Sequence, residues 1–143
     1  MKKTLFAVVV LFALSAVGLF ANRPVSANEL PANIQKFIKS HFPSVEVSYA
    51  KQDDDWLEKH YTVVLTNGDK LEFTNKGEWL EIDCEHNRVP EALIPVAIRE
   101  HVAQTQYGHH VIELKKERRH YEVRLNNKVE MEFSFDGRFL RFD

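Results

Sequence analysis

The chain has 143 residues, of which 44% are hydrophobic and 28% are charged. Its single cysteine excludes an internal disulfide and any zinc or iron–sulfur site built from several cysteines. The formal net charge is −2 at pH 7, but Lys2, Lys3 and Arg23 precede every acidic residue, and the rest of the chain carries 16 basic and 21 acidic side chains. A mildly acidic domain without a basic block is a poor partner for nucleic acid, because neutralising phosphates requires clustered lysine and arginine.

The first residues have the layout of a secretory signal peptide. A positive start is followed by an uncharged apolar run over residues 5–20, which is shorter than the roughly 20 residues that span a bilayer, so an uncleaved anchor is the less favoured interpretation. Small residues at Val25 and Ala27 define a cleavage site, and Ala21 is a weaker one because a bulky leucine stands two residues before it. We expect removal of residues 1–27, no membrane association afterwards, and a periplasmic or secreted location.

The remainder of the chain contains an internal duplication. His60–Asp83 and His120–Asp143 match at 10 of 24 positions when the sequence is shifted by 60 residues, far more often than chance allows. The upstream segments match more loosely, with Leu30-Pro31 corresponding to Val89-Pro90. The predicted divisions are a first repeat over 28–83, a linker over 84–88 and a second repeat over 89–143.

In the first repeat, apolar residues at helical spacing predict a helix from Pro31 to Phe42, which Pro43 ends. Alternating apolar residues then predict four strands. The strands are expected around residues 45–49, 61–65, 71–73 and 79–82, with a polar loop at Asp53-Asp54-Asp55 and turns at Asn67-Gly68 and Lys76-Gly77.

The second repeat follows the same order. Pro90 and Pro95 predict a broken helix that carries Ile98 and Val102, and Asp136-Gly137 is a strong hairpin signal. Its strands are expected around residues 111–114, 121–125, 131–133 and 139–142. The sequence therefore predicts an α+β fold of two tandem units, each with a helix and a four-stranded antiparallel sheet. Because a unit of this size is barely stable alone, we expect the two units to form one body. They either pack against each other or join their sheets into one concave surface.

The same alternation sorts the residues onto two sheet faces. We expect the helix to cover the face that carries Leu65 and Phe73, and the opposite face to be polar and crossed by Trp79 and Phe139. The two aromatic residues either shield a solvated sheet or anchor a protein partner. The residues proposed for partner binding are Trp79, Phe139, Glu72, Glu81, Arg124, Glu132 and Arg141.

No catalytic or metal-binding motif is recognisable in the sequence. The seven histidines form no His-x-x-x-His pair, and the three consecutive aspartates lack the spacing of a calcium loop. Cys84 and His86 lie two residues apart, so a thiolate–imidazole contact is the one alternative for nucleophilic catalysis, less favoured than an inert cysteine. We therefore expect no enzyme, no metal site and no cofactor.

The order of these motifs resembles the PepSY-like family, periplasmic proteins also described as beta-lactamase-inhibitor-like. The features that carry the resemblance are the Phe42-Pro43 helix end, the paired Tyr-x-Val and Glu-Phe motifs, and the two Gly-x-aromatic-Leu endings at Gly77 and Gly137. The resemblance covers residues 30–143 and implies tandem α+β units with no catalytic residues to transfer. The second repeat departs from it, because Tyr107-Gly108 stands where the helix end is expected.

These observations predict a non-catalytic extracytoplasmic protein-binding module with an unknown protein partner in the cell envelope, an inhibitor or modulator of a secreted or periplasmic enzyme being the more specific form. The alternative is a periplasmic small-molecule or metal-binding protein that uses its histidines. An enclosed apolar pocket with converging ionisable groups would favour the alternative, whereas an open sheet would favour protein binding.

Overall fold

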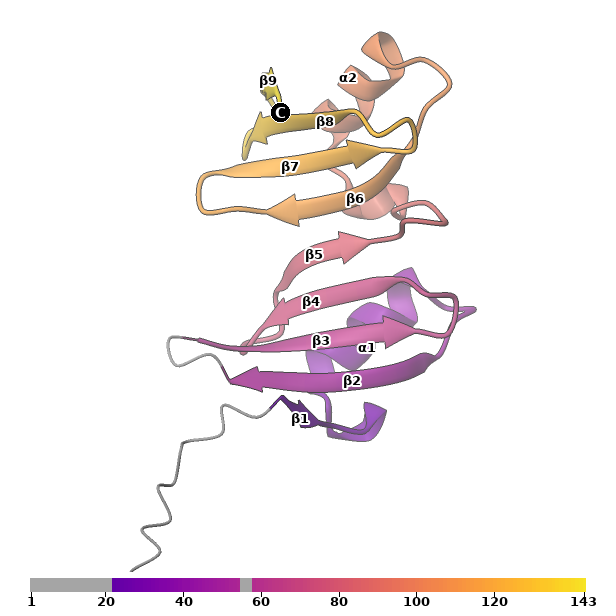
Figure 1. Cartoon of the computed structure of the whole chain (residues 1–143), viewed down its shortest axis with the longest axis vertical. Coiled ribbons are helices and arrows are strands. Elements are labelled where there is room, and N and C mark those ends of the chain that lie inside the picture. Colours follow the sequence, from indigo (N-terminus) through magenta and orange to yellow (C-terminus); the bar gives the residue numbers. More distant parts are fainter. Residues whose placement is uncertain (1–21, 55–57) are drawn as a thin grey trace, which may run out of the picture.

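The computed structural model describes residues 22–54 and 58–143, so most of the predicted signal peptide lies outside the described residues. The described residues form one antiparallel sheet of nine strands in sequence order, with two α-helices on the same side of it (Figure 1). The strands are β1 (Arg23–Pro24), β2 (Val47–Asp54), β3 (Lys59–Leu65), β4 (Lys70–Thr74), β5 (Trp79–Asp83), β6 (Val111–Lys116), β7 (His120–Leu125), β8 (Glu130–Ser134) and β9 (Phe139–Phe142). The helices are α1 (Ala32–His41) and α2 (Val96–Thr105), each preceded by a short 3-10 turn, Ala27–Glu29 and Glu91–Leu93.

An apolar stripe holds each helix against the sheet. In α1, Ile34 and Ile38 are buried one turn apart, and Ile98 and Val102 take the same positions in α2. A proline stands immediately before each helix, where its missing N–H removes no helical hydrogen bond. The helices therefore lie where the apolar spacing predicts them.

One continuous apolar row crosses the sheet beneath the helices. The strand register places its members side by side, and each is at most 2% exposed: Ala50, Val63, Leu71, Ile82, Leu114, Val123 and Met131. Ile82 and Leu114 pair across β5 and β6, where the two halves of the chain meet. The halves consequently share one hydrophobic core.

The mixed helix-and-sheet class and the joining of the sheets are confirmed, but the architecture differs from two four-stranded units. β5 pairs directly with β6, so the sheet has no boundary between the halves. β1 adds a strand that the sequence analysis had assigned to the signal peptide. β2 runs on through Asp53, which was expected in a loop, and the Asp53 carboxylate accepts hydrogen bonds from Lys51 Nζ (2.8 Å) and Thr62 Oγ1 (2.9 Å).

The predicted linker is also tied into the sheet. The Cys84 N–H donates to the carbonyl oxygen of Ile112 (2.7 Å), and the Val89 N–H donates to that of Val111 (3.0 Å). Cys84 and Val89 are both buried. Residues 84–88 are thus a short connection fixed at both ends against β6.

Trp79 does not lie on the face opposite the helices, contrary to the sequence prediction. A β-bulge interrupts the register between β4 and β5, so that Trp79 is the strand partner of Phe73. Since direct partners project to the same face, Trp79 shares the helix-covered face and packs against the core. The bulge inserts one residue and thereby reverses the face that simple alternation assigns.

The same correction applies to Phe139. A second bulge pairs it with Phe133, and its ring stacks on His101 of α2 at 4.7 Å between ring centroids. In each half the leucine that follows the aromatic residue, Leu80 or Leu140, is displaced from the helix-covered face instead. Leu140 is 44% exposed. Both predicted aromatic anchors therefore belong to the helix side of the sheet.

The residues just before the predicted cleavage site take part in the fold. β1 pairs with β2, the Val25 N–H donates to the carbonyl oxygen of Ala50 (3.0 Å), and the Val25 side chain is buried in the core. The Ser26 N–H donates to Glu29 Oε2 (2.7 Å), which caps the first 3-10 turn. Cleavage after Ala27 would remove all of these interactions.

We therefore expect the secreted chain to begin at Asn22, after Ala21, rather than at Asn28. Retaining residues 22–27 keeps β1 and the buried Val25 side chain, whose burial contributes about 1.5–3 kcal/mol. Intact-mass measurement of protein from the cell envelope distinguishes the two starts. A chain that begins at Asn28 would mean that β1 is dispensable for folding.

Candidate functional site

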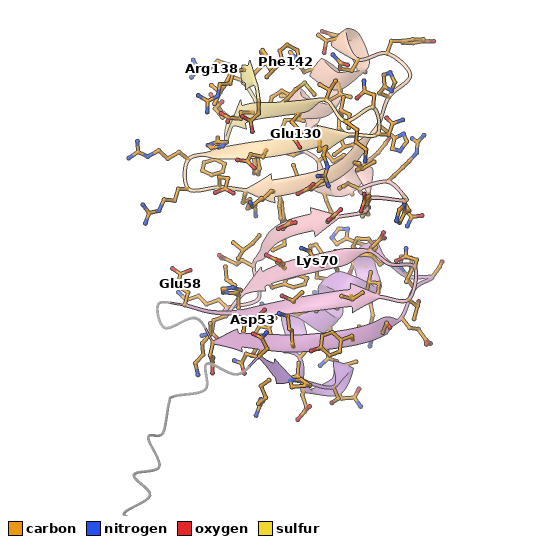
Figure 2. All side chains as sticks on the ribbon, viewed as in Figure 1. Asp53, Glu58, Lys70, Glu130, Arg138 and Phe142 are labelled. Carbon is orange, nitrogen blue, oxygen red and sulfur yellow. The ribbon has the colours of Figure 1, made fainter. Side chains whose placement is uncertain are left out.

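The sheet face opposite the helices, here called the open face, is charged. Figure 2 shows Lys70 and Glu130 on the near side of the sheet, with both helices behind it. One row of residues crosses this face from β2 to β9 through direct strand partners. This central row consists of Lys51, Thr62, Glu72, Glu81, Lys115, Glu122, Glu132 and Arg141.

A second row runs beside the central row. It consists of Tyr49, Val64, Lys70, Asp83, Glu113, Arg124 and Glu130. Across the two rows, carboxylates outnumber cationic side chains. The open face is therefore acidic as a whole, although cations are interspersed along it.

Glu72 and Glu81 face each other across β4 and β5, an unfavourable position for two like charges. Lys70 Nζ lies 3.3 Å from Glu72 Oε1 and 3.6 Å from Glu81 Oε1, and so offsets part of the repulsion. Burial, and then the Glu72 charge, nevertheless raise the pKa of Glu81 above its ordinary value, against the opposing effect of Lys70 and Lys115. Proton uptake would relieve the crowding of negative charge here.

Arg124 is surrounded by carboxylates in the second row. Its guanidinium forms an ion pair with Glu113 and lies 3.8 Å from Asp83 Oδ1 and 4.0 Å from Glu130 Oε1. Burial raises the pKa of Glu113, and the Arg124 charge only partly counteracts this. The single guanidinium of Arg124 thus lies close to three carboxylates.

These raised pKa values show how the face responds to added charge. A carboxyl group with a raised pKa in the folded state makes the protein less stable at neutral pH, and that cost falls as the pH drops through the raised pKa. A cationic group placed between Glu81 and Glu113 would relieve the same repulsion without protonation. The open face is electrostatically suited to accept positive charge.

A compact group of side chains lies where β7, β8 and β9 meet. His120 Nε2 is 3.4 Å from Glu122 Oε1 and 3.9 Å from Glu132 Oε1. The guanidinium Nη2 of Arg141 donates to Glu132 Oε1 at 2.8 Å. Glu132 is buried, which is unusual for a carboxylate and requires such partners.

The structure brings together most of the predicted binding residues. Glu72, Glu81, Glu132 and Arg141 lie in the central row and Arg124 lies in the second row, whereas Trp79 and Phe139 are on the other face. Sequence reasoning did not include Asp83, Glu113, Lys115 and Glu122 in the site. Alternation in the sequence already places Glu122 on the polar face, and the alternation of Ile112 and Leu114 was a signal for Glu113, but the pairing of β5 with β6, which brings Asp83 beside Glu113 and Glu81 beside Lys115, had no signal in the sequence.

The cysteine offers no nucleophile. Cys84 is fully buried, and burial, followed by the nearby Asp69 carboxylate, raises the pKa of its thiol far above the ordinary value. Since the thiolate is the nucleophilic form, a buried thiol with a raised pKa is a poor nucleophile at neutral pH. The proposed contact with His86 therefore has no basis in thiolate chemistry.

The hollow on the open face is small. It holds about 70 Å³ and is lined by the central-row residues Glu122 and Glu132 together with Arg124. A pocket for a small organic ligand has about 300–1,000 Å³. Two larger hollows are wide open to solvent. One of about 430 Å³ lies beside α1 and β2, and one of about 400 Å³ is lined by Glu58, Lys59, Thr74, Asn75, Lys76 and Glu78.

Residues 59–141 match the family described as "Putative beta-lactamase-inhibitor-like, PepSY-like". No functionally curated protein matches the chain significantly. No helix in the described parts of the chain is long and apolar enough to cross a membrane.

Several solved structures from Bacteroides are similar to this chain. One is described as a "putative calcium-regulated periplasmic protein" from Bacteroides thetaiotaomicron; it is 38% identical with a TM-score of 0.82, and the alignment covers 85% of this chain and 96% of that chain. A "putative periplasmic protein" from Bacteroides vulgatus is 39% identical with a TM-score of 0.81 and the same coverage. Another from that organism, "of unknown function", is 35% identical with a TM-score of 0.82, covering 86% of this chain and 99% of that chain.

These similarities agree with the location expected from the N-terminal sequence, which is periplasmic or secreted. The family match extends over more than half of the chain and includes β3 to β8. The chain belongs to the PepSY-like family.

Proposed function

We propose that this protein is a non-catalytic periplasmic binding module whose open face binds a protein partner with a basic surface. The observation that carries the proposal is the continuous charged surface formed by the central and second rows, in which carboxylates outnumber cations. Complementary charge across an interface speeds association and orients the partner. The raised pKa values of Glu81 and Glu113 support a preference for a cationic surface.

The shape of the open face favours a protein over a small molecule. Its hollow of about 70 Å³ is too small for an organic ligand, whereas the rows extend across the sheet from β2 to β9. Stable protein interfaces need broad surfaces of about 800 Å² on each partner. Of the alternative, the metal-binding form is supported by the cluster of possible metal ligands that the described residues form around His120.

The partner class that we propose is a secreted or periplasmic enzyme that the protein inhibits or modulates. This is supported by the family's beta-lactamase-inhibitor-like description and rests on similarity alone. The duplication remains part of the proposal. It is supported by matching registers, since Thr62 pairs with Glu72 as Glu122 pairs with Glu132, and each half has a bulge at its Glu-Phe step.

Site-specific photo-crosslinking in the periplasm tests the binding face. A photoreactive residue at Glu72 or Glu130, both on the open face, is expected to give adducts of the same mass. The matched control is Lys36, which is exposed on α1 and should give no such adduct. Because exposed charges are screened by salt, the adduct yield should fall as ionic strength rises.

The identity of the crosslinked protein then tests the partner class. We expect a secreted enzyme with a basic surface, whose activity changes when the purified module is added. Adducts from Lys36 without adducts from Glu72 or Glu130 would contradict the open-face assignment. Adducts that are insensitive to salt would contradict the role of charge.

A further inference from the structure

We propose that His120, Glu122 and Glu132 form a binding site for one divalent transition-metal ion, with Zn²⁺ as the reference ion. From the sequence we expected no metal site, with metal binding through the histidines as the alternative. The inference goes beyond protein binding, because the ion needs no partner protein to bind.

The backbone places the three ligands together. His120 and Glu122 are two residues apart on β7 and therefore share a face, and Glu132 on β8 is the direct strand partner of Glu122. Each side chain offers one ligand atom, and these atoms all lie within 4.8 Å of one another. Imidazole nitrogen and carboxylate oxygen are common ligands of Zn²⁺.

The spacing suits a small ion. Bonds of about 2.1 Å in tetrahedral geometry place ligand atoms about 3.4 Å apart. The distance from His120 Nε2 to Glu122 Oε1 is 3.4 Å, and that to Glu132 Oε1 is 3.9 Å. The three ligand atoms all lie within 4.8 Å of one another, so side-chain rotations would bring them to bonding distance of one ion.

The charge balance at the site also favours an ion. Glu122 and Glu132 are opposed like charges, and Glu132 is only 6% exposed. Two cations lie beside them: Lys115, the strand partner of Glu122 on β6, and Arg141, whose side chain is 67% exposed while it donates to Glu132 Oε1. Arg141 can therefore swing into solvent when an ion takes over the charge of Glu132.

The first half of the chain provides an internal comparison. His60, Thr62 and Glu72 hold the corresponding strand positions, with Thr62 paired to Glu72. A threonine thus replaces one of the two carboxylates, and among the described residues the cluster at His120 is the one group of three such ligands that lie this close together. Glu122→Thr converts the second half to the composition of the first.

The ligand set favours a transition metal over calcium. Ca²⁺ takes six to eight oxygen ligands, whereas this site has one nitrogen and two carboxylates. Imidazole with carboxylates suits zinc and its first-row neighbours. We expect Zn²⁺ to bind more tightly than Ca²⁺ by a wide margin.

The test is calorimetric titration of the mature protein with ZnCl₂. We expect one ion per chain, and about tenfold or more weaker binding in Glu122→Thr and Glu122→Gln. Removing the competing cation in Arg141→Gln should tighten binding. His109→Ala, outside the cluster, should have no effect and controls for adventitious binding by exposed histidines.

Two further measurements separate binding from folding. Thermal melting in EDTA shows whether each variant is folded, and zinc should raise the melting temperature of the wild type and of Arg141→Gln but not of Glu122→Thr. Co²⁺ should give visible absorption bands that Glu122→Thr abolishes.

Three results would overturn the proposal: equal zinc affinity in the wild type and both Glu122 variants, loss of zinc binding in His109→Ala, or Ca²⁺ binding as tight as Zn²⁺ binding. Photo-crosslinking in EDTA remains a separate test of protein binding.

Discussion

Replacing Phe73 with alanine is expected to lower the free energy of unfolding by about 3–5 kcal/mol. The Phe73 side chain is fully buried beneath α1, where the ring of Phe37 meets it edge-on at 5.3 Å between centroids. Truncation removes these contacts and leaves a cavity that the surrounding strands only partly fill. Chemical denaturation followed by circular dichroism measures the loss.

The matched control is Phe135→Ala, which removes the same ring from a residue that is 50% exposed. Its effect is expected to be about 1 kcal/mol or less, mainly from the edge-on contact with Tyr121. Similar losses of unfolding free energy in the two variants would contradict the burial of Phe73.

Because the two halves share one core, we also expect the protein to unfold in a single transition. A second transition that Phe73→Ala leaves unchanged would contradict the shared core.

Gly137→Ala is the second substitution with a large expected effect. Gly137 has a φ of +86°, and a methyl group there would lie 2.5 Å from the Cβ of Ala97 in the first turn of α2. The left-handed backbone costs a non-glycine residue about 1–2 kcal/mol, and overpacking adds about 1–3 kcal/mol. The free energy of unfolding should fall by the sum of the two, measured by denaturation.

Gly108→Ala separates these two contributions. Gly108 has a similar φ of +81°, but nothing lies within 4 Å of an added Cβ, so the backbone cost alone should remain. In the double variant Gly137→Ala/Ala97→Gly, the overpacking contribution to the loss of unfolding free energy should disappear. The double variant still carries the separate cost of a glycine inside a helix. Equal losses in Gly108→Ala and Gly137→Ala would show that α2 does not press on the β8–β9 turn.

Much of the secondary structure was predictable because its periodicity lies within single segments. The spacing of Ile34 and Ile38 identified α1, and the alternation of Val63 and Leu65 identified the buried face of β3. Such patterns depend on neighbouring residues only. The predictions made from such patterns were correct wherever the backbone remained regular.

The failures came from features that involve two strands at once. Alternation continues through Leu80 and Ile82 in the sequence, yet the bulge opposite Phe73 turns Trp79 toward the helices. The pairing of β5 with β6 likewise joins segments separated by a connection and a helix, so Lys115 could not be placed beside Glu81 from the sequence. The charged central row is a product of register, and register is set by the whole sheet.

The strand order of the sheet also determines how the chain can fold. Every strand from β2 to β9 pairs with the strand before it, and each helix precedes the strands that it covers. Contacts of short sequence separation lower the entropy cost of loop closure and favour rapid folding. A chain delivered to its compartment from the N-terminus can therefore extend its sheet one strand at a time. Each added strand covers the exposed edge left by the last, which shortens the time during which unpaired edges can cause aggregation.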